Sequence, residues 1–153
     1  MHVFIFYCHG IRMSMFGACL LESFALVKSE CNGGDVLLSM ASASSRNSLQ
    51  ELRLESVEAP DVDLHHIVPL PSLTKFRLQE GQQIPDGDIL FRWRLKPLSN
   101  TSIDALGSLA TLTSLTLEML HVREDQTLRL HTAVQRLINL KDFLWFAYRT
   151  SRQ

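Results

Sequence analysis

The chain carries the stretch Leu49-Gln-Glu-Leu52-Arg-Leu54, and its leucine spacing returns three more times. The later copies are Leu73-Thr-Lys-Phe76-Arg-Leu78, Leu112-Thr-Ser-Leu115-Thr-Leu117 and the weaker Leu140-Lys-Asp-Phe143-Leu-Trp145. Leucine fills 21 of the positions from 49 to 145, more than an ordinary domain uses. Such self-similarity is typical of stacked repeats, in which each unit buries its apolar face against its neighbours.

The spacing between motifs indicates the size of each unit. Motif starts at 49, 73, 112 and 140 are 24, 39 and 28 residues apart. The first and last steps match leucine-rich units of about 20–29 residues. The middle step is too long for one unit, and Leu90-Phe-Arg-Trp93-Arg-Leu95 predicts a fifth motif inside it. Residues 81–88, which contain a proline and a glycine, would then turn back without forming a helix. The sequence therefore predicts four or five units.

The segments between motifs carry apolar residues at helical spacing. This pattern predicts helices over residues 99–110 and 124–138 and a shorter helical segment over 62–68. The alternation of strand, turn and helix predicts an α/β fold. We expect a curved solenoid over residues 48–148, with parallel strands on its concave face and short helices and loops on its convex face. Residues 149–153 would form a tail.

Residues 1–47 precede the repeats and form an N-terminal lead-in. Residues 3–7 predict a short strand, and apolar spacing from Ser14 to Lys28 predicts a helix. Two interpretations are open, a divergent first repeat or a poorly specified approach to the array. Residues 31–47 predict a turn, a short apolar piece and a flexible joint.

Composition narrows the class of partner and the compartment. A net charge of -1 and a pI of about 6.6 give no global field that would attract nucleic acid or an anionic membrane. Three cysteines without a Cys-x-x-Cys pair favour reduced thiols in the cytoplasm or nucleus. The apolar runs near the N-terminus are interrupted, which disfavours a membrane span or a secretion signal. A secreted glycoprotein bearing a glycan on Asn100 is the alternative to test.

Signatures of catalysis and metal binding are absent from the sequence. It contains no nucleophile elbow, phosphate-binding loop or His-Glu-x-x-His motif, so we expect no enzyme and no cofactor. Asp61, Asp63, His65 and His66 lie close together but lack the helical spacing of a ligand set. We interpret them as a solvated loop and expect no metal.

Over residues 48–148 the chain resembles the leucine-rich repeat family. It is similar to the irregular repeats of intracellular F-box/leucine-rich proteins and of plant immune receptors. It departs from the family pattern where an Asn or Cys usually closes the motif, at Val57, Gly81, Leu120 and Tyr148. Residues 1–47 show no F-box, and the chain has no nucleotide-binding loop.

The resemblance implies a protein–protein interaction scaffold that recognises its partner through the concave face. In an F-box setting the scaffold would select substrates for ubiquitin ligation. The alternative is an incomplete piece of a longer repeat protein, for example an immune receptor, with no binding activity of its own.

The residues between the leucines predict the binding surface, because alternate side chains of a strand face opposite ways. The middle of the concave face would be basic. Its members are Arg53, Lys75, Arg77, Arg92, Arg94 and Lys96. Such a patch suits an acidic or phosphorylated peptide, although ordinary solvated charge explains the same residues. Nucleic acid would need a broader basic surface with interleaved aromatics, and Trp93 takes a core position in this register.

Aromatic residues crowd the last predicted strand, where Trp145, Phe146 and Tyr148 lie without a polar cap. An uncapped terminal strand leaves an open sheet edge. We therefore expect either a docking edge that supports end-to-end association with another chain, or the continuation of the array in a longer protein.

Overall fold

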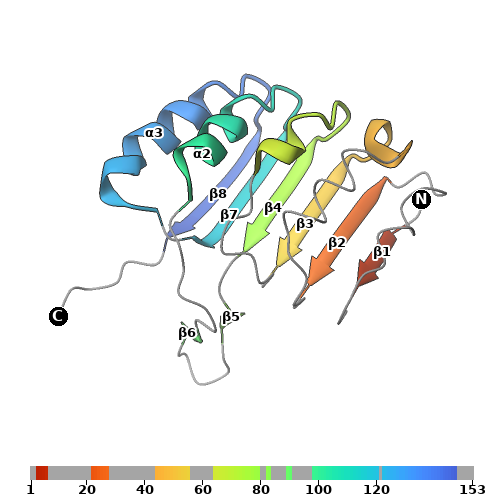
Figure 1. Ribbon diagram of the computed structural model, residues 1–153, viewed down its shortest axis with the longest axis horizontal. Coiled ribbons are helices and arrows are strands. Elements are labelled where there is room, and N and C mark those ends of the chain that lie inside the picture. Colours follow the sequence, from red (N-terminus) through yellow and green to blue (C-terminus); the bar gives the residue numbers. More distant parts are fainter. Residues whose placement is uncertain are drawn as a thin grey trace.

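The structure is a computed structural model that describes residues 3–6, 22–27, 44–55, 64–79, 82–83, 89–90, 98–120 and 122–147. Six strands form one parallel sheet in chain order (Figure 1). They are β1 (Val3–Phe6), β2 (Ser23–Val27), β3 (Glu51–Glu55), β4 (Lys75–Gln79), β7 (Ser114–Leu120) and β8 (Asp142–Ala147). Each strand therefore lies beside the one before it in this series. The prediction of an α/β fold with a parallel sheet is confirmed.

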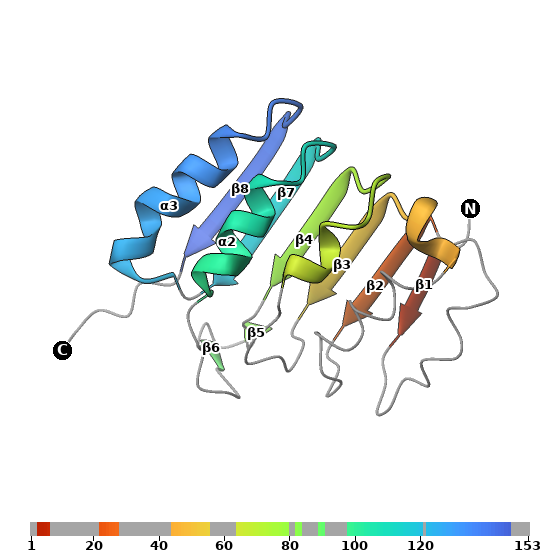
Figure 2. The same cartoon turned by 45° about the horizontal axis from the view of Figure 1, so that its top comes forward.

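The described helices all cover one face of this sheet, and none of them lies on the other face, called the open face below (Figure 2). A short 3-10 helix, η2 (Ser44–Asn47), precedes β3, and a second, η3 (Leu64–Ile67), precedes β4. Two α-helices follow along the chain, α2 (Asn100–Gly107) and α3 (Glu124–Gln135). The helices predicted over 99–110 and 124–138 are confirmed as α2 and α3, which end a few residues earlier than the apolar pattern suggested. The short segment predicted over 62–68 is the single turn η3.

The repeated motif places its apolar residues in two rows under the helices. The pairing register stacks Phe24, Leu52, Phe76 and Leu115 in one row, and Leu26, Leu54, Leu78 and Leu117 in the other. All eight side chains are buried. Full burial of one such side chain contributes about 1.5–3 kcal/mol, so the two rows are the main stabilising feature of the sheet.

A backbone contact repeats where each strand begins. The carbonyl oxygens of Glu22, Gln50, Thr74 and Thr113 each accept two N–H donors from the start of the next strand, at 2.8 to 3.1 Å. Hydroxyl groups add to this series, since Thr74 Oγ1 donates to the Gln50 carbonyl and Thr113 Oγ1 to the Thr74 carbonyl, both at 3.2 Å. The strand starts are thereby held in one register, as the motif requires.

The helix predicted from Ser14 to Lys28 is wrong over residues 23–27, which form β2. The signal for the strand is Leu21-Glu-Ser-Phe24-Ala-Leu26, another copy of the leucine motif. The helical spacing of apolar residues from Phe16 to Val27 hid it, because short apolar runs fit both periods. The strand predicted at residues 3–7 is confirmed as β1. The predicted boundary between the lead-in (residues 1–47) and the repeats (from residue 48) therefore falls within one continuous sheet. The flexible joint predicted at the end of the lead-in contains η2.

The fifth motif, predicted at residues 90–95, is also wrong as a strand of the parallel sheet. β4 pairs directly with β7, so no strand lies between them. Leu90 instead belongs to β6 (Ile89–Leu90), which pairs antiparallel with β5 (Gln82–Gln83) in a separate two-stranded sheet. The long step of 39 residues therefore holds this small hairpin and α2. The spacing of three apolar residues was insufficient to distinguish the two arrangements.

Polar contacts cap α2 and join α3 to the start of α2. Ser99 caps α2, because its Oγ accepts the Ser102 N–H at 3.1 Å. Gln126 of α3 is buried, and its Nε2 donates to the Leu98 carbonyl at 2.7 Å and to Asn100 Oδ1 at 2.9 Å. A Cβ added to Gly107 would lie 3.1 Å from Ala133 Cβ, so α2 and α3 approach closely there.

Candidate interaction surfaces

The open face of the sheet carries polar rows over its interior strands. One row aligns Arg53, Arg77, Thr116 and Leu144, and the next aligns Glu55, Gln79, Glu118 and Phe146. The charged and polar members of these rows are half-buried, while Leu144 and Phe146 are exposed. Charge therefore lies over β3, β4 and β7, and the apolar part of the face lies at β8.

The charged side chains form a connected ladder across three strands. Arg53 Nη2 lies 2.6 Å from Glu55 Oε1. Arg77 Nε lies 3.3 Å from the same oxygen without an aligned hydrogen bond, and Arg77 Nη2 donates to Glu118 Oε2 at 2.9 Å. Each arginine thus touches at least one carboxylate, and Glu55 touches both arginines. The ladder holds the long side chains in defined positions on the open face.

Two members of the predicted basic surface, Arg53 and Arg77, are paired with carboxylates in this ladder. The described open-face residues include the cations Arg53, Lys75 and Arg77 and the carboxylates Glu51, Glu55, Glu118 and Asp142. The carboxylates offset the cations, and two of them pair with the arginines. The sequence shows that Glu55 and Glu118 occupy the row next to the arginines on the same face. It does not show that their carboxylates contact the arginine side chains. The described part of the face is therefore charge-balanced rather than cationic.

The structure brings together only part of the predicted binding set. Arg53, Lys75 and Arg77 lie on adjacent strands β3 and β4. Arg92, Arg94 and Lys96 lie outside the described residues. Because β4 pairs directly with β7, the slot that these three residues were predicted to fill is absent from the sheet.

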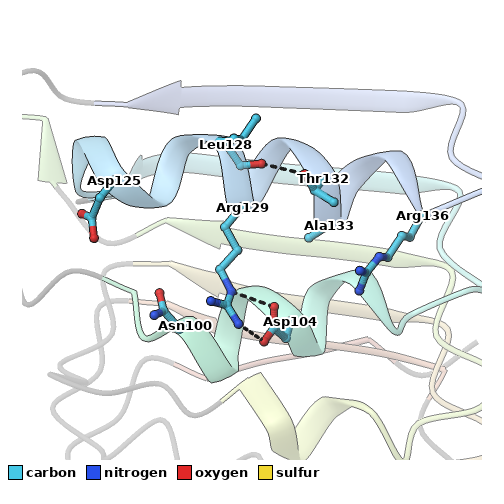
Figure 3. Close-up of a pocket in the computed structure, with 8 residues that line it drawn as sticks. All are labelled: Asn100, Asp104, Asp125, Leu128, Arg129, Thr132, Ala133 and Arg136. Carbon is cyan, nitrogen blue, oxygen red and sulfur yellow. Dashed lines mark hydrogen bonds and ion pairs between the residues drawn. The ribbon is translucent and has the colours of Figure 1, made fainter.

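An open groove of about 470 Å³ lies between side chains of α2 and α3 on the helix side. Figure 3 shows Arg129 reaching from α3 to Asp104 of α2, with Nε to Oδ1 at 2.9 Å and Nη2 to Oδ2 at 2.6 Å. The hydrogen bond from Arg129 lowers the pKa of Asp104, and the same contact raises the pKa of Arg129. Both groups are exposed, so this pair contributes little to stability. The groove is polar and open, and no nucleophile–base pair occurs among its lining residues.

The edge strand β8 has a different character from the interior strands. Phe143 and Trp145 occupy the two core rows. Phe143 is 42% exposed, whereas its row neighbours Leu115 and Phe76 are 0% and 2% exposed. Trp145 packs against the core but its buried Nε1 has no acceptor among the residues described. Trp145 and Phe146 thus lie on the predicted open edge, and Tyr148 lies outside the described residues.

Other predicted sites can be placed only in part. His65 is exposed and His66 is half-buried on η3, while Asp61 and Asp63 lie outside the described residues. Within the described ranges no three His, Cys, Asp or Glu side chains come together as a metal-binding group. Among those same residues, no helix combines the length and the apolar character needed to cross a membrane.

Within the described part of the chain, the open sheet face and the β8 edge are the surfaces whose features differ from those of an ordinary solvated exterior. Comparison of the chain with family models, with curated proteins and with solved structures found no match.

Proposed function

We propose that the chain is a leucine-rich repeat scaffold that binds a protein or peptide along the open, concave face of its sheet. One observation carries the proposal: every described helix lies on one face of the sheet, which leaves a row of strands open on the other. Parallel sheets are ordinarily covered on both faces, so an uncovered parallel face is suited to a partner. The role proposed is binding rather than catalysis, in the cytoplasm or nucleus.

The ion-pair ladder supports this role through preorganisation. Arginine and glutamate side chains lose rotamer freedom when a partner immobilises them, at a cost of about 0.5–1.5 kcal/mol each. Contacts at 2.6 and 2.9 Å already restrain Arg53, Arg77 and Glu118 before a partner arrives. Binding on this face would therefore lose less conformational entropy than binding on a surface of free side chains.

The ladder also refines the kind of partner proposed. A purely acidic or phosphorylated peptide would have to displace Glu55 or Glu118 from the arginines. A segment with both charge signs could instead add to the ladder, and apolar residues at one end could contact Leu144 and Phe146. We propose such a mixed segment. The acidic or phosphorylated peptide, and substrate selection of the F-box kind, remain the competing versions of the same function.

The test is Thr116→Arg, which places a bulky cation in the centre of the open face without removing a ladder residue. Thr132→Arg makes the same chemical change on α3, where Thr132 is exposed on the helix side. Both variants, verified as folded by circular dichroism, would be screened beside the wild type against a displayed peptide library. Peptides that bind the wild type and Thr132→Arg but lose at least tenfold in affinity for Thr116→Arg support the proposal. Peptides that bind all three proteins equally, or no enriched peptides, contradict it.

A second candidate is a repeat segment that belongs to a longer array and binds no separate partner. The exposure of Phe143, a core-row residue, favours it. In that case the library yields nothing for any of the three proteins, while a further leucine-rich unit fused after β8 raises stability.

A further inference from the structure

The core rows of the sheet reach β8 and are left partly uncovered there. Phe143 lies in the row whose interior members are buried, yet 42% of its surface is exposed. Ile138, in the turn before β8, is 84% exposed. Both residues lie at the end of the helix-covered layer, so this end of the core exposes apolar surface to water.

β8 is also apolar on the face that is polar in the neighbouring strands. Leu144 aligns with Thr116 and Arg77, and Phe146 aligns with Glu118 and Gln79. Their exposed fractions are 52% and 56%. A strand that is apolar on both faces is typical of a strand that is covered on both faces. Natural edge strands are usually blocked by lysine or proline, and Phe143–Ala147 contains neither.

The hydrogen-bonding groups of β8 alternate between β7 and the free edge. Asp142 donates its N–H to the Thr113 carbonyl at 3.1 Å, so its backbone groups face β7. Because consecutive residues of a strand direct these groups to opposite sides, the N–H and C=O groups of Phe143 and Trp145 face the free edge. An antiparallel partner strand would bond to these two residues.

We propose that a second copy of the chain occupies this edge, with the two β8 strands paired antiparallel about a two-fold axis. Two-fold contacts use the same patch on both subunits and are the commonest form of self-association. In the two registers centred on Leu144 or on Trp145, Phe143 and Trp145 meet apolar residues on the helix side. Leu144 meets Leu144 or Phe146 on the open side, and no like charges between residues 142 and 147 are opposed.

The exposed area fits a weak dimer that forms at high concentration. Ile138, Phe143, Leu144 and Phe146 are 84%, 42%, 52% and 56% exposed. With about 200 Å² for each large apolar residue, they leave roughly 500 Å² of accessible surface. Two copies would bury at most about 1,000 Å² in total, which is the size of a weak or transient interface.

The experiment is sedimentation velocity on the full chain from low to high micromolar concentration. The test variant is Leu144→Lys, which places two ammonium groups near the two-fold axis. Val68→Lys is the matched control, since Val68 is an exposed apolar residue in the turn between η3 and β4, away from this edge. We expect a monomer–dimer equilibrium that Val68→Lys preserves. Leu144→Lys should weaken it by about tenfold or more, because like charges at an interface are strongly unfavourable.

Charge complementation separates this interface from a general loss of folding. Leu144→Lys mixed with Leu144→Glu should restore the dimer, since opposite charges then face each other across the axis. Restoration supports the two-fold pairing. A wild type that stays monomeric at every concentration overturns the proposal, as does a dimer that Leu144→Lys leaves unchanged. Open-ended growth also overturns it, because that would indicate head-to-tail contact with β1 of the next copy. A failed peptide screen would not affect this result, because the two surfaces are tested by different variants.

Discussion

Leu115→Ala should reveal how much stability the stacked apolar rows provide. Leu115 lies on β7 between Phe76 and Phe143 of its row and is 0% exposed. Replacing a fully buried leucine with alanine loses the transfer free energy of the removed atoms and leaves a cavity, which together cost about 2.7–5 kcal/mol. The edge of the sheet can relax toward this site, because Phe143 is only partly packed. We therefore expect the lower half of this range, about 3–4 kcal/mol.

Urea unfolding followed by circular dichroism measures this loss. With a slope of about 2 kcal/mol per molar urea, the midpoint should fall by roughly 1.5–2 M. The matched control is Leu128→Ala, which deletes the same atoms from a side chain that is 75% exposed and should change stability by less than about 0.5 kcal/mol. If the two variants lost the same stability, or Leu115→Ala lost under about 1 kcal/mol, the row would not be the core of the sheet.

Three further changes test polar features. Gln126→Leu should lower the free energy of unfolding by about 2–4 kcal/mol, measured by urea unfolding. It removes two hydrogen bonds that Gln126 donates and leaves the Leu98 carbonyl without its donor. A neutral or stabilised variant would show that the carbonyl is hydrated. Glu55→Gln should cost about 0.2–1 kcal/mol in urea unfolding, because both ion pairs of Glu55 are half-exposed. It should also lower the coupling between Arg53 and Arg77 in a double-mutant cycle; an unchanged cycle would argue against the ladder. The pKa of Asp104 is lowered by Arg129, so its small contribution is present above the unfolded pKa near 3.8 and is lost as pH falls through the lower folded value. The difference in stability between wild type and Asp104→Asn should accordingly shrink below about pH 4; a difference that grew on acidification would reverse the assigned sign.

Much of the sheet could be predicted from the sequence because the motif encodes both register and burial. Leu52, Phe76 and Leu115 each sit three residues after the leucine that opens the motif, and pairing aligns all three. The opening leucines Leu49, Leu73 and Leu112 are buried as well. The two long helices could be predicted because their apolar residues span several turns.

Two errors have a common physical origin. The pattern at Phe24 and Leu26 was assigned to a helix, and the pattern at Leu90 and Trp93 was assigned to the parallel sheet. In both cases a few apolar residues fit more than one local structure, and the pairing partner decided between them. That partner is a non-local contact, which a single segment does not specify.

The candidate site was less predictable than the fold. Strand alternation placed Arg53, Arg77 and Glu118 correctly on one face. Whether arginines there are free or paired depends on side chains that reach diagonally to the next strand, as Arg77 does to Glu118 at 2.9 Å. Counting charges at single positions therefore gave no sign that Arg53 and Arg77 are paired with carboxylates.

The bonding at the strand starts has a consequence for how the chain opens. Among the described elements, each strand packs on its immediate neighbours in the series, and α2 links η3 to α3. Unfolding free energy in such an arrangement accumulates from neighbour to neighbour, so the ends should fray before the middle. Amide hydrogen exchange should be slowest in β3, β4 and β7 and faster in β8. A strand added beside β8 would slow amide exchange in β8, and the exchange rates of the interior strands would change little.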